Sequence, residues 1–130
     1  MSRSDMLPRK PIGAIFADVI LRGPGGVRTQ RLMVDTGATY TWVPEALARE
    51  LGARVRRTLS VRLGDGRIVE RTMGELEVEI HGRTGTVPLV FGIEDDVSVV
   101  GVTTLEILLL EPDPVTGNLR PAPYALLLIA

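Results

Sequence analysis

Apolar and polar residues alternate along much of the chain with the period of two that is typical of β-strands. Residues 12–21 and 27–34 form two such segments, and the glycine-rich residues 23–26 between them predict the turn of a hairpin. Across residues 75–82, acidic and apolar residues alternate, so we expect one face of this strand to be solvated and the other to be packed. The pattern therefore predicts β-sheet.

A second hairpin is predicted over residues 59–74. Its tip falls at residues 64–66, where two glycines favour positive φ. Apolar runs at residues 86–92 and 97–101 predict buried strands.

Two segments have the features of short helices. In residues 44–52, Pro44 suits the first turn and Gly52 suits the position just past the end. Residues 103–106, with the sequence TTLE, have the spacing of a capping box, which predicts that Thr103 opens a second helix. The whole pattern predicts an all-β fold with one or two short helices.

The two ends of the chain carry few signals. Residues 111–121 are rich in Pro, Gly and Asn and predict a turn region, and residues 122–130 predict a closing strand. The apolar residues 124–130 are far too few to span a bilayer, and residues 1–11 lack the apolar segment of a secretory signal. We therefore expect no membrane span and favour a cytoplasmic location. The initial Met1 argues against a domain that was cut from a longer precursor and acts on it.

Composition narrows the class of protein. The 130 residues predict a single domain, and 45% hydrophobic with 24% charged residues is ordinary for a globular protein. With 15 basic and 16 acidic residues, the net charge of −1 creates no broad field for nucleic acid, so no nucleic-acid partner is expected. The absence of cysteine excludes thiol catalysis, disulfides and thiolate metal sites.

Asp35 is the strongest chemical signal, because it directly follows an apolar run. A carboxylate beside a buried strand costs free energy unless something there uses it. Gly37 lets the backbone turn so that nearby N–H groups can bind the carboxylate, and the hydroxyl of Thr36 can hold the loop rigid. The small Ala38 leaves space for a substrate backbone. The alternative interpretation of these residues is a plain turn.

Other chemical candidates favour structural interpretations. His81 lies in a turn-like segment and is expected to be solvent-exposed, since nothing in the spacing sets it beside a serine. The acidic residues 94–96 lack the spacing of a calcium loop and predict a solvated loop, so no metal site is expected. Four arginines lie near the second hairpin: Arg54, Arg56, Arg57 and Arg62. They either favour acidic residues in a substrate or form a solvent-exposed strand face, and we prefer the strand face.

Three motifs occur in one order after the first hairpin: VDTGAT at residues 34–39, RLGDGRI at residues 62–68, and VVG at residues 99–101, leading into a helix. With these motifs the chain resembles the single-domain, retroviral-type (retropepsin-like) aspartic proteases, over roughly residues 12–125. The resemblance implies a closed, barrel-like half of an acid protease with a flap hairpin. Two such halves form a two-fold homodimer, with one Asp35 from each subunit at the axis.

The resemblance also implies an activity and its residues. It implies an aspartic endopeptidase that acts on polypeptides without a cofactor, using water activated between the two carboxylates. The implied catalytic residues are Asp35, Thr36 and Gly37, and the implied substrate-binding residues are Ala38 and the flap residues Gly64, Asp65 and Gly66. Thr36 would bond across the dimer axis, and the flap would close over the substrate.

Two departures from the viral pattern stand out. The flap tip carries Asp65, where viral flaps are more apolar, and the chain after the last helix is longer. The apolar residues 124–130 either join a sheet between subunits or pack as a last core strand. The alternative function is a catalytically silent dimerisation or peptide-binding module with the same fold. The intact D-T-G-A favours activity, because a scaffold gains nothing from a costly carboxylate pair at its interface.

Overall fold

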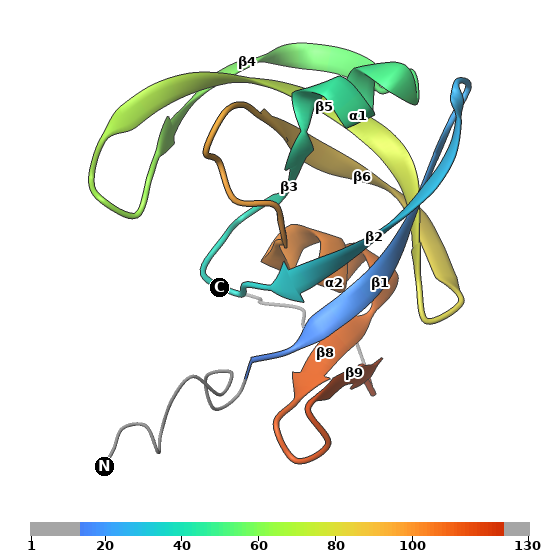
Figure 1. Cartoon of the computed structure of the whole chain (residues 1–130). Coiled ribbons are helices and arrows are strands. Elements are labelled where there is room, and N and C mark those ends of the chain that lie inside the picture. Colours follow the sequence, from blue (N-terminus) through green and yellow to red (C-terminus); the bar gives the residue numbers. More distant parts are fainter. Residues whose placement is uncertain (1–13, 124–130) are drawn as a thin grey trace, which may run out of the picture.

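Strands make up most of residues 14–123, the part of the chain that this computed structural model describes (Figure 1). In chain order the elements are β1 (Phe16–Gly23), β2 (Gly26–Val34), β3 (Thr41–Pro44), α1 (Glu45–Glu50), β4 (Arg54–Arg62), β5 (Ile68–Ile80), β6 (Arg83–Gly92), β7 (Val99–Val100), α2 (Val102–Leu108), β8 (Leu110–Asp113) and β9 (Asn118–Pro121). The prediction of a mostly β chain with short helices is confirmed.

Seven of these strands form one sheet in the order β1-β2-β7-β3-β6-β5-β4, and β1 also pairs with β5. Because β5 pairs with β1 as well as with β6, the order of strands closes on β1, and β4 remains an edge strand beside β5. β2 runs parallel to β7, and β3 runs parallel to β6, whereas the hairpins are antiparallel. The parallel pairings bring the end of β2 beside a segment that follows it by about sixty-five residues, with Val34 opposite Val100.

Both predicted hairpins are present. β1 and β2 pair from Phe16 opposite Met33 to the turn where Gly23 faces Gly26. β4 and β5 form the second hairpin, which arches away from the rest of the sheet (Figure 1). At its tip Gly66 has a φ of +91°, a backbone conformation that suits glycine.

The core is formed by buried apolar residues from the main sheet, both helices and the β8–β9 hairpin. In β5, Leu76, Val78 and Ile80 are buried while Glu77 is exposed, which confirms the predicted solvated and packed faces. β6 adds further buried apolar residues, among them Phe91, as its apolar run predicts. Helix α1 follows Pro44 as predicted.

Helix α2 begins differently from the prediction. Its N-cap is Gly101, which makes no side-chain cap, so the expected capping box led by Thr103 is wrong. The backbone N–H groups of Val102 and Thr103 instead donate to the carbonyl oxygens of Ala38 and Thr39, at 2.8 and 3.0 Å. A distant loop thus supplies the acceptors that a side chain would otherwise provide. Neither helix in residues 14–123 has the length and apolar character to cross a membrane.

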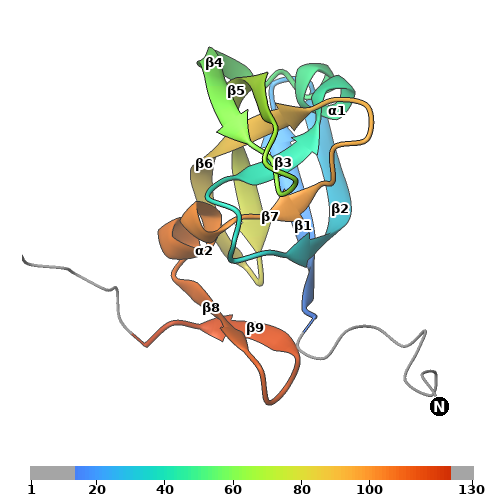
Figure 2. The same ribbon diagram turned by 90° about the vertical axis from the view of Figure 1, so that its left-hand side faces the viewer.

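The segment after α2 also departs from the prediction. The turn predicted within residues 111–121 lies at residues 114–117, where Gly117 has a φ of +76°, but the strands β8 and β9 on either side of it pair as a hairpin that was not predicted. Leu119 on β9 is buried, which gives this hairpin an apolar contact that the turn-rich composition conceals. In Figure 2 the hairpin lies below the main sheet. The predicted dimer-sheet or core strand at residues 124–130 lies outside the described residues.

Gly74 provides a test of how tightly β5 packs on the core. A Cβ atom added there would lie 2.7 Å from the carbonyl oxygen of Arg54 and 2.8 Å from Cζ of Phe91. Because overpacking typically costs about 1–3 kcal/mol, we expect Gly74→Ala to lower the free energy of unfolding by roughly that amount, as measured by denaturant titration. Gly64→Ala is the matched control, since nothing lies within 4 Å of its added Cβ. Equal stability of the two variants would contradict the packing described.

Candidate active site

Asp35 lies directly after β2, where that strand runs beside β7. Its backbone N–H donates to the carbonyl oxygen of Val100 at 2.9 Å, which continues the parallel pairing past the end of the strand. The side chain is half-buried. The carboxylate is therefore placed by the sheet itself, as the apolar run before it predicts.

The two residues after Thr36 shape the turn around this carboxylate. The N–H of Gly37 donates to Oδ1 of Asp35 at 2.9 Å, and the N–H of Ala38 donates to the Asp35 carbonyl oxygen at 3.0 Å. A Cβ atom at position 37 would lie 3.2 Å from Oδ1, so glycine leaves the carboxylate room. Within residues 14–123, no cationic side chain lies within ion-pair distance of Asp35. One carboxylate oxygen is thus oriented by a neutral backbone donor.

A buried polar pair fixes the far end of the same loop. The hydroxyl oxygens of Thr41 and Thr104 lie 2.6 Å apart, and Thr41 Oγ1 accepts the N–H of Gly101 at 3.0 Å. Both threonines are buried. A Cβ atom at Gly101 would lie 2.3 Å from the carbonyl carbon and oxygen of Tyr40, so only glycine permits this approach. Sequence reasoning missed the two threonines; the one signal was the apolar-apolar-glycine motif.

A cleft of about 840 Å³ opens above Asp35. Of the predicted site residues, the structure brings Asp35, Gly37, Ala38 and Gly64 together in its lining. Thr36, Asp65 and Gly66 do not line it: all three are exposed. Asp65 bonds instead to Arg67, whose Nε lies 2.8 Å from Oδ2. In Figure 2 the tip of the β4–β5 hairpin lies in front of β3.

The remaining walls of the cleft were not predicted. Tyr40 and Trp42 contribute aromatic surface; Trp42 belongs to β3, which is too short to show a periodic pattern. Residues 59–63 and Arg67 line the cleft from the β4–β5 hairpin, beside the predicted Gly64. Three residues of the loop between β6 and β7 line the other side: Asp95, Asp96 and Val97.

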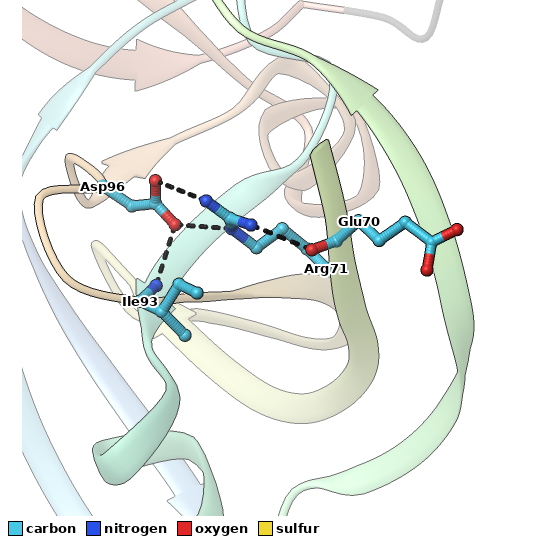
Figure 3. A network of polar contacts seen from close by, with 4 residues as sticks. All are labelled: Glu70, Arg71, Ile93 and Asp96. Atoms are coloured by element: carbon cyan, nitrogen blue, oxygen red, sulfur yellow. Dashed lines mark hydrogen bonds and ion pairs between the residues drawn. The ribbon is translucent and has the colours of Figure 1, made fainter. Parts of the chain in front are cut away.

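The solvated acidic loop predicted over residues 94–96 is corrected at Asp96, whose side chain is only 11% exposed. Arg71 of β5 binds it with two N–H groups, and the N–H of Ile93 donates to it as well (Figure 3). These contacts, led by the Arg71 side chain, hold the pKa of Asp96 below its usual value. The sequence separation of 25 residues hides this pair from any local pattern.

One other prediction holds: His81 is exposed, in the turn between β5 and β6. The four arginines Arg54, Arg56, Arg57 and Arg62 are exposed on β4, and Arg62 also lines the cleft. Within the described residues, no group of three or more acidic or histidine side chains is arranged to bind a metal ion.

Comparison with known protein families gives one finding. A family model described as "Aspartyl protease" matches residues 19–105, a span that contains the Asp35 turn, the β4–β5 hairpin and β7. No curated protein matches the chain.

The threonine pair generates a stability prediction. Thr41→Val leaves the Gly101 N–H and the Thr104 hydroxyl buried without their partner. At about 1–3 kcal/mol for each of the two unsatisfied groups, we expect a loss on the order of 2–6 kcal/mol in the free energy of unfolding. Thr41→Val/Thr104→Val should lose less than the sum of the two single variants, because no hydroxyl is then stranded. Additive losses in denaturant unfolding would contradict the pairing.

Asp96 generates a prediction about acid stability. Its folded-state pKa lies below that of an unfolded aspartate, about 3.9, so its contribution is present above that value and is lost as the pH falls through the folded pKa. We expect the free energy of unfolding to fall from about pH 5 downwards. Asp96→Asn should show a shallower slope, while Asp65 and Asp113, whose pKa values are also lowered, titrate in both proteins. Equal slopes would show that the pair adds nothing.

Proposed function

The chain belongs to the retropepsin-like aspartyl protease family, and on this premise we propose that it is an endopeptidase active as a homodimer. In the dimer, the two copies of Asp35 face each other across a two-fold axis and activate one water. The two halves of the site are identical, as an isologous interface requires.

One observation carries the proposal. Asp35 lies in the lining of a cleft large enough for a peptide, on a turn held by backbone hydrogen bonds and with no cation beside it in residues 14–123. The chain has a single D-T-G, whereas this chemistry needs two carboxylates. A second copy of the chain supplies the second carboxylate.

The mechanism follows from placing two carboxylates in contact. Both cannot ionise cheaply, so the pair holds one proton over a broad pH range. The ionised Asp35 takes a proton from a water between the two groups, and the protonated Asp35 polarises the scissile carbonyl. The water attacks to give a tetrahedral intermediate, without a covalent enzyme adduct. The pair then protonates the leaving amine as the C–N bond breaks.

Thr36 and the β4–β5 hairpin complete the proposed site. The exposed side chain of Thr36 is available to bond across the dimer axis and lock the two turns together. The hairpin tip of Gly64, Asp65 and Gly66 acts as the flap, which closes over the substrate, bonds its backbone and excludes water. The bond from Asp65 to Arg67 fixes the shape of that tip while Gly64 faces the cleft.

The decisive variant is Asp35→Asn, which keeps the shape of the side chain and an acceptor for the Gly37 N–H. We expect it to fold and to cleave an unstructured protein about 10²–10⁴-fold more slowly than wild type, because the dyad can no longer exchange a proton. Cleavage is measured from mildly acidic to neutral pH at low and high protein concentration. The wild-type rate per subunit should rise with concentration, since neither half holds a complete dyad.

Asp18→Asn is the matched control, because Asp18 is an exposed aspartate on β1 that does not line the cleft. It should cleave like wild type. Full activity of Asp35→Asn would contradict the catalytic role. A wild-type protein that is folded and dimeric, binds peptides and does not cut would instead favour the peptide-binding module.

A further inference from the structure

Arg71 and Asp96 form the least exposed ion pair in residues 14–123. Their side chains are 13% and 11% exposed, whereas every other ion pair there has a partner that is at least 35% exposed. Exposed pairs contribute little, but a charge left alone in a site that water scarcely reaches is costly. The positions of these two side chains therefore depend on each other.

The geometry of the pair is a two-pronged contact with a third donor. Arg71 Nε lies 2.7 Å from Oδ2 of Asp96, and Nη2 lies 3.1 Å from Oδ1 (Figure 3). The backbone N–H of Ile93 donates to the same Oδ2 at 2.8 Å. Planar, paired contacts of this kind fix orientation as well as distance, which a single ammonium contact cannot do.

The pair fixes a loop whose backbone is already constrained. The N–H of Asp96 donates to the carbonyl oxygen of Ile93 at 3.0 Å, so backbone and side-chain bonds both close the turn from residue 93 to residue 96. Within this turn Glu94 has a φ of +49°, which is uncommon for a residue with a Cβ atom. Without Asp96, one of the two ties that hold the turn is lost.

This loop is one wall of the cleft. Asp95, Asp96 and Val97 line it, and the Val97 side chain is 69% exposed. Arg71 does not line the cleft, yet it belongs to β5, the second strand of the β4–β5 hairpin. The ion pair therefore ties the strand that carries the hairpin to the wall that the hairpin faces.

We propose that Arg71 and Asp96 are positioning residues for substrate binding: their ion pair sets the distance between the flap hairpin and the wall formed by residues 93–98. This inference rests on the proposed function, because the substrate is the peptide held in that cleft. Neither residue takes part in the chemistry at Asp35. Loss of the pair should therefore weaken binding much more than it slows the chemical step.

The ion pair also makes the position of the wall formed by residues 93–98 depend on pH. Arg71 lowers the pKa of Asp96, and Arg67 acts on Asp96 in the same direction. Asp96, with a smaller effect from Glu94, raises the pKa of Arg71. Asp96 is thus ionised through mildly acidic pH, and the wall stays fixed where a shared-proton dyad is active. Protonation of Asp96 at lower pH breaks the pair, so we expect the KM of the wild type to rise as the pH falls through the lowered pKa of Asp96. Asp96→Asn has no titrating group at this position and should lack that rise.

The test compares steady-state cleavage of one peptide by wild type, Asp96→Asn, Arg71→Lys and Glu111→Gln. Glu111→Gln is the matched control, because it breaks an exposed ion pair with Arg120 on the β8–β9 hairpin. We expect KM to rise about tenfold in Asp96→Asn, with kcat changed less than roughly twofold and the control like wild type. Arg71→Lys keeps the charge without the fork and should lie between them.

Amide hydrogen exchange supplies a readout that needs no activity. The Ile93 N–H should exchange at least about tenfold faster in Asp96→Asn than in wild type, while the amides of β1 and β2 keep their wild-type rates. An unchanged KM, or equal losses in KM and kcat together with faster exchange throughout the sheet, would overturn the proposal. If wild type neither cleaves nor binds a peptide, the proposed function fails and the substrate role fails with it. Slow exchange at Ile93 would then show that the pair fixes only the loop.

Discussion

The site depends on backbone hydrogen bonds that join the turn after β2 to the segment that runs from β7 into α2. Asp35 donates to Val100, Val102 donates to Ala38, and Gly101 donates to the hydroxyl of Thr41. The bonds to Val100 and from Gly101 to Thr41 satisfy polar groups of buried residues, which would otherwise lack a partner. The carboxylate is therefore held by main-chain geometry over more than sixty residues of sequence separation, not by the local turn alone.

These long-range hydrogen bonds also distinguish the part of the cleft that is firmly held from the part that is weakly held. The floor of the cleft lies where the turn after β2 meets the segment that runs from β7 into α2. Gly101 permits the close approach of these two segments. Near the tip of the β4–β5 hairpin, the two strands pair only with each other. This part of the hairpin therefore has few contacts to hold it in one position. A rigid floor beneath a weakly held hairpin is what the proposed closure of the flap over a substrate requires. The Arg71–Asp96 pair ties this hairpin to the wall formed by residues 93–98.

Local patterns predicted the elements whose stability is local. Alternation located both hairpins and the two faces of β5, and the D-T-G sequence located the turn that orients Asp35. The errors at Thr103 and Asp96 share one physical cause, which is a partner far away in sequence. Thr103 needs no capping box because distant carbonyl oxygens accept from α2, and Asp96 is not solvated because Arg71 reaches it. Thr41 could not be assigned, because its partner Thr104 is 63 residues away.

The central claim is that each chain carries half of a catalytic dyad. It is tested most directly by titrating a fixed amount of wild-type protein with folded, dimeric Asp35→Asn and following peptide cleavage. If two Asp35 carboxylates form one site, mixed dimers are inactive, so activity falls to about half at equal amounts and towards zero in excess. Activity that stays constant at every excess of Asp35→Asn would contradict the shared site and would mean that one chain works alone.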